Sequence, residues 1–335
     1  MYFKFLLIIA LGMFVLTIEG FGQSIKKALV QPIKWENIKY HAVEHVALTD
    51  TCFIMVSNRH IDAKKLNFAD EFSDTTQTHI LFVTKRDSIW HIYELETLEQ
   101  ACSMMPSRDW VLYAEGMGKL FTGNLQRGNL MQAMYQVNVI LFDYASINSQ
   151  LGLLKNFNFS LHNAEKSAHQ YYHFLCEVKK IQQQTTFFKH KHLSIFLHSM
   201  GNILLKNMML AKYFDTHQMP IVDNLILNAA CINRKNHHAW LAHPEFAKRV
   251  FVHFNQADNK LFGAMILSGN RKLGSKPIRP FATGVNYINF HAVVGKTHNY
   301  FLNIPERTFR LSPMLYNYLN TILHGNSIAL PLKFY

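Results

Sequence analysis

The chain has 335 residues, and its 34 Lys and Arg residues exceed its 22 Asp and Glu residues by 12. Hydrophobic residues make up 49% of the sequence and charged residues only 17%, which excludes a disordered or low-complexity chain. The sequence has no Gly-x-y period, sustained heptad or internal repeat, so collagen, coiled coils and repeat folds are excluded too.

The N-terminal segment has the pattern of an export signal. Lys4 precedes an apolar run over residues 5–18, and Gly20 and Gly22 supply small residues for cleavage after Gly22. This run is shorter than the ~20 apolar residues that a spanning helix needs. We therefore expect residues 1–22 to be a signal peptide and the protein to be exported, either periplasmic or secreted. An uncleaved N-terminal membrane anchor is the alternative.

The four cysteines leave two interpretations open. In an oxidising compartment they allow two disulfides in three connectivities. None stands in a C-x-x-C or metal-ligand spacing, so four small buried side chains are an equally good interpretation. The residues are Cys52, Cys102, Cys176 and Cys231.

Short β-branched and aromatic runs alternate with longer amphipathic segments along the chain. From Val137 onward these runs are nearly continuous in apolar residues, as in strands buried on both faces of a parallel sheet. Helical spacing lies between them in residues 164–178 and 203–210, and a last helix follows the capping pair Ser312-Pro313. The predicted strands are Cys52–Ser57, His79–Thr84, Ile89–Tyr93, Trp110–Ala114, Val137–Phe142, Leu193–Leu197, Asn224–Ala229, Val250–Phe254 and Val285–Phe290.

This alternation predicts an α/β fold with a doubly wound, mostly parallel sheet. The strands before Trp110 lie close together in sequence, so they are expected to add antiparallel strands at one edge. No linker rich in Pro, Gly or Ser divides residues 23–335, which favours a single domain. Within it, residues 23–108 supply the edge strands and residues 109–325 the main core.

One predicted strand runs directly into Leu197-His198-Ser199-Met200-Gly201 and then into a helical segment. A nucleophile elbow needs this order, because the sharp turn lifts the Ser199 hydroxyl above the sheet. Gly201 keeps the crossing of strand and helix free of a Cβ atom, and the Met200 amide can donate to a developing oxyanion. An ordinary Ser-x-Gly turn is the alternative. The pattern G-x-S-x-G has Leu197 at its first glycine position.

An acid and a base follow in the order Ser, Asp, His. Asp258 comes just after one predicted strand, and His298 lies in a glycine-containing loop after the next. His291 is the alternative base. A neutral His298 would take the proton of Ser199 during attack, while Asp258 would fix the tautomer of the imidazole.

A second oxyanion donor is expected from the loop Glu115-Gly116-Met117-Gly118, where two glycines allow close backbone approach. The Met117 amide is the candidate donor, and a plain glycine turn is the alternative. No carboxylate completes a known metal-site pattern with the histidines, so no metal is expected. No other cofactor is expected either. Five histidines are expected in solvated loops: His190, His192, His237, His238 and His243.

With these motifs, the sequence resembles the α/β-hydrolases of the esterase/lipase superfamily, and most closely the bacterial groups of unknown function. The resemblance runs from about Trp110 to Phe301, with a looser match at residues 53–59. It implies an acyl hydrolase with Ser199 as nucleophile, Asp258 as acid and His298 as base. The segments that carry it are Glu115–Gly118, Phe142–Ser146, His198–Asn202, Asn255–Leu261 and Gly295–Phe301.

Two positions depart from this family pattern. Glu115 stands where relatives usually have histidine, and its carboxylate would repel an oxyanion unless it turned away or were paired, for example with Lys119 or Arg127. Cys231 stands where relatives often have an aspartate, which removes one alternative acid and favours Asp258.

The expected function is that of an exported serine hydrolase that cleaves carboxylic esters, lipids or other acyl substrates through an acyl-enzyme. The alternative is a non-catalytic envelope binding protein with the same fold, which the departures at Glu115 and Leu197 would favour. Scattered basic residues without a binding motif argue against nucleic acid as a partner, and the net charge suits anionic envelope surfaces. The sequence indicates neither the acyl specificity nor the oligomeric state.

Overall fold

A computed structural model describes residues 33–42, 46, 48–62, 67–74, 76–211, 215–242 and 244–329. The predicted signal peptide, residues 1–22, lies outside these ranges. Within them, every helix falls short of the length and apolar character that crossing a bilayer requires.

The described strands are β1 (Ile38–Ala42), β2 (Cys52–Ser57), β3 (Arg59–Asp62), β4 (Asn67–Ser73), β5 (His79–Arg86), β6 (Ile89–Leu95), β7 (Trp110–Ala114), β8 (Asn138–Asp143), β9 (Leu193–His198), β10 (Val222–Asn228), β11 (Ala247–Phe254) and β12 (Val285–Asn289). The described α-helices are α2 (Leu98–Ser103), α3 (Phe121–Tyr135), α4 (Leu153–Lys166), α5 (Ala168–Gln184), α6 (Asn202–Leu210), α7 (His237–Leu241), α8 (Asn259–Ser268), α9 (His291–Val294) and α10 (Pro313–Leu323). Short 3₁₀ helices are η1 (Trp35–Asn37), η2 (Ser199–Gly201) and η3 (Thr216–Gln218).

Ten of these strands form one sheet in the order β1-β6-β5-β2-β8-β7-β9-β10-β11-β12, and β3 pairs with β4 in a small second sheet. All pairings from β2 through β8 to β12 are parallel, whereas β5 runs antiparallel to both β2 and β6. The predicted fold class is therefore confirmed. The reversal at β5 follows from its two-residue connection to β6, in which Asp87 has φ 55°.

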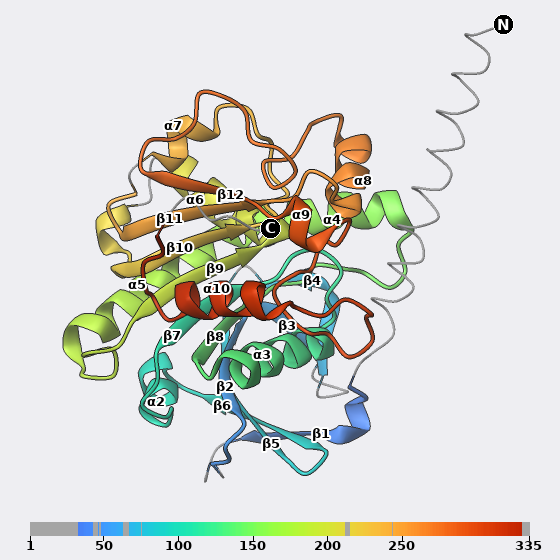
Figure 1. Cartoon of the computed structure of the whole chain (residues 1–335). Helices are drawn as coiled ribbons and strands as arrows, with labels where there is room; N and C mark the ends of the chain where they lie inside the picture. Colours follow the sequence, from blue (N-terminus) through green and yellow to red (C-terminus); the bar gives the residue numbers. More distant parts are fainter. Residues whose placement is uncertain are drawn as a thin grey trace, which may run out of the picture.

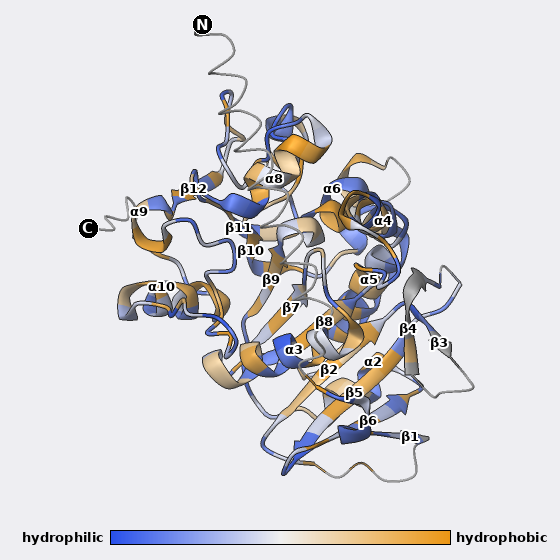
Figure 2. Ribbon diagram, turned by 90° about the vertical axis from the view of Figure 1, so that its right-hand side faces the viewer, coloured by the Kyte–Doolittle hydropathy of each residue, from blue (hydrophilic) through white to orange (hydrophobic). Residues whose placement is uncertain are grey.

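The sheet is covered by helices on both faces (Figure 1). Helices α3 and α10 lie on one face, and α4, α5 and α6 lie on the other (Figure 2). Every residue of β2, β7, β8, β9 and β10 is buried, as the continuous apolar runs of these strands predicted. Much of the central sheet, including β2, is coloured as hydrophobic in Figure 2.

The helical periodicity of residues 164–178 is split between two helices in the structure. Helix α4 ends at Lys166 and α5 begins at Ala168, with the buried Ser167 between them. Asn58, just beyond β2, donates from Nδ2 to Ser167 Oγ at 2.9 Å. A polar contact from a distant segment thus fixes the break.

A buried ion pair joins the N-terminal part of the sheet to the end of β8. Arg59 Nε lies 2.8 Å from Asp143 Oδ2, and both side chains are fully buried. Ser57 Oγ and Asn124 Nδ2 also donate to Asp143, at 2.8 and 2.5 Å. Arg59 Nη2 donates to the backbone oxygens of Lys119 and Tyr144 at 2.9 and 2.8 Å. The pair therefore fixes the loops that follow β7 and β8.

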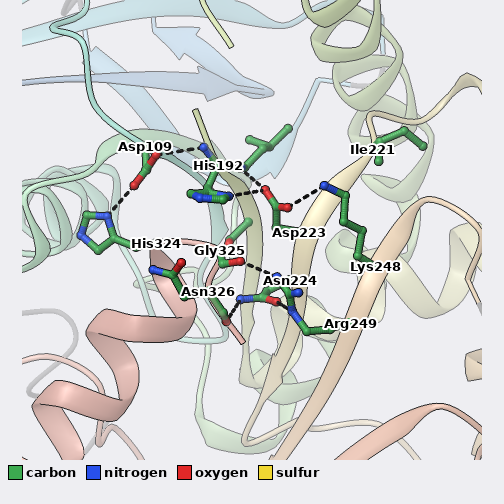
Figure 3. Close-up of polar contacts among 12 residues, drawn as sticks. Asp109, His192, Ile221, Asp223, Asn224, Lys248, Arg249, His324, Gly325 and Asn326 are labelled. Atoms are coloured by element: carbon green, nitrogen blue, oxygen red, sulfur yellow. Dashed lines mark hydrogen bonds and ion pairs between the residues drawn. The ribbon is translucent and has the colours of Figure 1, made fainter. Parts of the chain in front are cut away.

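A second polar cluster lies at the other end of the sheet, where the strands begin (Figure 3). Asp223 accepts from His192 Nδ1 at 3.1 Å and from Lys248 Nζ at 2.8 Å. His324, at the end of α10, bonds Asp109 Oδ2 through Nδ1 at 2.7 Å. The bonds of Asp223 join β10 to the segment before β9 and to β11, and the bond of His324 attaches the end of α10 to the segment before β7.

The structure has all four cysteines as free thiols, three of them buried and Cys176 partly buried. This arrangement corresponds to the interpretation as small packed side chains. Burial raises the pKa of the Cys231 thiol to about 11, so this thiol is protonated near neutral pH.

Replacing Asp143 with Asn tests the role of the buried pair. The uncompensated guanidinium of Arg59 would then remain buried, so the free energy of unfolding should fall by about 3–5 kcal/mol in urea titrations. The matched control is Glu36→Gln, because Lys34 and Glu36 form an exposed pair at 3.3 Å with side chains 73% and 69% exposed. Its effect should stay below about 1 kcal/mol. Equal effects of the two substitutions would contradict this role.

Candidate active site

Ser199 stands at the turn between β9 and α6, at the carboxyl end of the parallel strands. Its φ is +52°, in the left-handed region that few non-glycine residues adopt. The residue is 8% exposed, and the short 3₁₀ turn η2 begins with it. This strand–turn–helix geometry is that of a nucleophile elbow.

Gly201 makes the elbow possible by close contact with the end of β7. A Cβ atom at this position would lie 2.7 Å from the backbone oxygen of Ala114 and 2.8 Å from that of Glu115. Both distances are shorter than a carbon and an oxygen tolerate, so position 201 has room only for glycine unless the backbone shifts.

Asn202 closes the elbow from below, a role that the sequence analysis did not assign. Its side chain is fully buried, and Nδ2 lies within hydrogen-bond distance of three backbone oxygens. These belong to Leu197 at 3.0 Å, Ser199 at 3.0 Å and Asn228 at 3.4 Å. The Ser199 oxygen also accepts from the Cys231 amide at 3.0 Å. Nothing in the sequence singled out Asn202 except its position after the motif.

Leu197 occupies the first glycine position of the pattern without disturbing the turn. It is the fifth residue of β9 and is fully buried. Its partners in the neighbouring parallel strands are Leu227 and Ala114. The small side chain of Ala114 leaves space beside the larger leucine.

Asp258 and His298 lie together at the ends of neighbouring strands. His298 Nδ1 and Asp258 Oδ2 are 2.6 Å apart, and the side chains are 13% and 0% exposed. The other carboxylate oxygen of Asp258 caps α8 by accepting from the amides of Lys260 and Leu261 at 2.9 and 3.0 Å. The cap fixes the carboxylate, which in turn orients the imidazole.

Asn255 connects the loop of Asp258 with the loop of His298. Its fully buried side chain donates from Nδ2 to the backbone oxygens of Gly295 and Thr297, both at 2.9 Å. Its Oδ1 accepts from the Ala257 amide at 3.1 Å. Asn255 therefore holds the segment before His298 against the segment before Asp258. The alternative base, His291, is exposed at the start of α9 and makes no bond to Asp258.

Ser199 and His298 are not hydrogen-bonded to each other in this structure. Ser199 Oγ has no hydrogen-bond partner among the described residues, and His298 uses only Nδ1. The ring of His198, adjacent to Ser199, lies 4.7 Å from the ring of His298, centroid to centroid. The imidazole of His298 is thus next to the elbow. Catalytic hydrogen bonds are often long or unformed without substrate.

The loop after β7 lies directly against the elbow. A Cβ atom on Gly116 would be 2.6 Å from Ser199 Cβ and 2.9 Å from the Met200 amide nitrogen. Gly118 has φ +86°, which glycine adopts without strain. The Met117 amide has no hydrogen-bond partner among the described residues. The loop and the Met200 amide therefore border the same small space beside Ser199.

The carboxylate of Glu115 is buried at 2% exposure, and cations surround it. Its Oε1 accepts from Tyr113 Oη at 2.7 Å and lies 3.3 Å from Arg127 Nε, and Oε2 lies 3.9 Å from Lys119 Nζ. Burial would raise the pKa of this carboxyl, but the charges of Lys119 and Arg127 outweigh it and hold the pKa below its usual value. Glu115 is consequently a paired anion. It also accepts from the Gly116 amide at 3.0 Å, which leaves Met117 as the free donor of this loop.

A row of buried polar side chains crosses the ends of three strands. His198 Nδ1 bonds Asn228 Oδ1 at 2.9 Å, and Asn228 Nδ2 lies 3.3 Å from His253 Nδ1. His253 Nε2 bonds Tyr318 Oη, on α10, at 2.7 Å. Burial lowers the pKa of His198 and of His253 to about 3. At His198 the charge of Glu115 offsets part of this lowering. Both rings are therefore neutral near pH 7.

Five histidines were predicted to lie in solvated loops, and for His237 this prediction is wrong. It is fully buried and bonds the Arg234 oxygen and Tyr287 Oη, each at 2.8 Å. His237 is the first residue of α7, and this short helix also buries Trp240 and Leu241. The packing of α7 against the core therefore buries His237. His243 lies outside the described residues. No group of three His, Cys, Asp or Glu side chains in the described ranges is placed to hold a metal ion.

The ten-stranded sheet, the strand–turn–helix elbow and the loops at the carboxyl edge define an α/β-hydrolase fold. The chain belongs to the family described as alpha/beta hydrolase of unknown function (DUF900), whose model matches residues 94–308, more than half of the sequence. This confirms the resemblance seen in the sequence. A search of curated proteins and a search of solved structures gave no match.

Substituting Gly201 with Ala tests the contact between the elbow and β7. The added methyl group would meet two backbone oxygens, so we expect a loss of about 2–4 kcal/mol in the free energy of unfolding. Gly152→Ala is the matched control, since no atom lies within 4 Å of a Cβ there, and its effect should stay within about 0.5 kcal/mol. A Gly201→Ala protein as stable as the control would refute the contact.

The two neutral histidines predict how stability depends on pH. The unfolded chain protonates them near pH 6.5 and the folded chain only near pH 3, so unfolding becomes easier as pH falls through this window. Between pH 7 and pH 5 the two residues together should reduce the free energy of unfolding by on the order of 4 kcal/mol. His253→Gln should remove about half of this dependence in urea titrations. An unchanged dependence in that variant would show that His253 does not contribute.

Proposed function

We propose that the protein is a serine hydrolase that cleaves carboxylic esters, with Ser199 as nucleophile, His298 as general base and Asp258 as the acid that orients it. The observation that carries the proposal is the fully buried Asp258 carboxylate bonded at 2.6 Å to His298, whose ring lies beside the elbow of Ser199. We further propose that the protein acts after export, on the basis of residues 1–22.

The first half of the reaction would form an acyl-enzyme. Ser199 Oγ attacks the ester carbonyl carbon while its proton passes to His298 Nε2, and the carbonyl oxygen becomes an oxyanion. The amides of Met117 and Met200 donate to that oxygen. As the intermediate collapses, the ester C–O bond breaks, and His298 returns the proton to the departing alcohol.

The second half would regenerate the serine. Water attacks the acyl carbon and gives a proton to His298, a second oxyanion forms, and the bond to Ser199 Oγ breaks. The proton of His298 returns to Ser199, and a carboxylic acid is released. Throughout, the Asp258 carboxylate accepts a hydrogen bond from the Nδ1–H of His298 and stabilises the imidazolium that forms in each half.

A non-catalytic binding protein is the second candidate function. Two features favour it: the missing hydrogen bond between Ser199 and His298, and the Glu115 carboxylate at the start of the proposed oxyanion loop, residues 115–119. Two observations support hydrolysis instead: the charge of Glu115 is paired, and Ser199 occupies the left-handed conformation of an elbow. We therefore propose hydrolysis as the function.

Labelling with a fluorophosphonate and turnover of short-chain aryl esters test the proposal. The wild-type protein should react with the label and hydrolyse the esters, and Ser199→Ala should abolish labelling and reduce kcat by about 10⁴-fold or more. Asp258→Asn should reduce kcat by about 10³- to 10⁴-fold, because the wrong imidazole tautomer is then favoured. His291→Ala serves as the control and should retain turnover.

A folded wild-type protein that neither reacts with the label nor cleaves any ester would decide for the binding function. Turnover that persists in Ser199→Ala would instead move the nucleophile to another residue. Circular dichroism of each variant separates a lost reaction from a lost fold.

A further inference from the structure

A group of cationic side chains lies beside the oxyanion loop and exceeds the charge of Glu115. Lys119 ends the loop itself, and Arg127 follows on α3. Arg307 lies in the segment that follows His298. Gln126 on α3 contacts this segment, because its side-chain amide donates to Glu306 Oε1 at 2.8 Å. We call Lys119, Arg127 and Arg307 the cationic cluster.

The side chain of Arg127 has N–H groups that donate no hydrogen bond to the described residues. It is 6% exposed, and its Nε makes an ion pair with Glu115 at 3.3 Å. Neither Nε nor Nη1 has a hydrogen-bond partner among the described residues. Buried donors without partners are costly, at about 1–3 kcal/mol each. An acceptor from a ligand would remove this cost.

Lys119 is also incompletely paired. Its Nζ lies 3.9 Å from Glu115 Oε2, beyond hydrogen-bond distance, and its side chain is 14% exposed. Burial lowers the pKa of Lys119 to about 8; Glu115 acts in the opposite direction, and Arg127 and Arg307 add to the lowering. The Glu115 carboxylate therefore offsets the cost of burying the Lys119 charge only in part.

The cluster surrounds Glu115, whose neighbour Gly116 contacts the Ser199 turn. Gly116, next to Glu115, touches Ser199 and the Met200 amide. The first turn of α3 begins immediately after this loop, with no acidic side chain and no side-chain cap. The positive end of its helix dipole adds to the positive potential on the same side.

We propose that Lys119, Arg127 and Arg307 form a subsite for an anionic group, a carboxylate or a phosphate, on the substrate whose ester bond Ser199 attacks. The inference rests on the proposed function and specifies its substrate class: esters that carry a negative charge near the scissile bond. An oxyanion of the ligand would accept from the unused Arg127 donors and balance the excess positive charge. Glu115 would keep the two inner cations in position.

Two matched esters test the subsite through catalysis. Nitrophenyl hemiglutarate and nitrophenyl valerate have acyl chains of equal length, but only the first carries a carboxylate. The wild-type protein should favour the hemiglutarate in kcat/KM by about tenfold or more, mostly through KM, and added salt should reduce the ratio. Arg307→Gln should lower the ratio about tenfold. The control, Arg86→Gln at the exposed β5–β6 hairpin, should leave it unchanged.

Binding to Ser199→Ala tests the subsite without turnover. Inorganic phosphate and glutarate, titrated separately by calorimetry, should each bind, and the tighter of the two identifies the anion. The double variant Ser199→Ala, Arg307→Gln should bind about tenfold more weakly. Arg307 is chosen because it is exposed, whereas loss of Arg127 would leave Glu115 buried and less well paired.

The outcomes separate this inference from the proposed function. A neutral ester cleaved through Ser199, with no preference for the hemiglutarate and no anion binding, would overturn the subsite and leave the hydrolase intact. Failure of both esters and of fluorophosphonate labelling would overturn the hydrolase and, with it, the assignment to a substrate. Anion binding that ignores Arg307→Gln would place the anion elsewhere and also reject the subsite.

Discussion

The candidate site depends on the contact between two turns, one after β7 and one after β9. These strands are neighbours in register, so their carboxyl ends bring Glu115–Gly116 against Ser199–Gly201. The contact is between backbones: Gly201 lies against the Ala114 and Glu115 oxygens, and Gly116 lies against Ser199. Any larger side chain at either glycine would move the oxyanion loop away from the hydroxyl. The pairing of β7 with β9 thus brings the proposed nucleophile next to the proposed oxyanion donors.

Buried polar side chains hold the rest of the site to this contact. Asn202 donates to three backbone oxygens at the elbow. Asn255 bonds the loop of His298 to the loop of Asp258. The Arg59–Asp143 pair fixes the far end of the oxyanion loop through the Lys119 oxygen. A buried amide or charge is favourable only when its partners are in place, so these groups select one arrangement of the loops over other compact ones.

The sequence indicated the elements of this site better than their supports. β-Branched, aromatic and apolar runs predicted nine strands, which are β2 and β5 to β12. The signal is strongest in the central strands, because they need buried side chains on both faces. The edge strand β1, with its less buried residues, gave no such signal. Arg59 and Asp143 are 84 residues apart in the chain, and nothing local marks them as partners. For the same reason, the break at Ser167 and the burial of His237 came only from contacts with distant segments.

The left-handed backbone of Ser199 has a consequence for how the chain balances stability against chemistry. An L-residue in this region costs of order 1–3 kcal/mol that glycine would not incur. Glycine at position 199 would avoid this strain but would lack the hydroxyl. The proposed role of Ser199 as nucleophile explains why the chain has a strained serine here instead of an unstrained glycine.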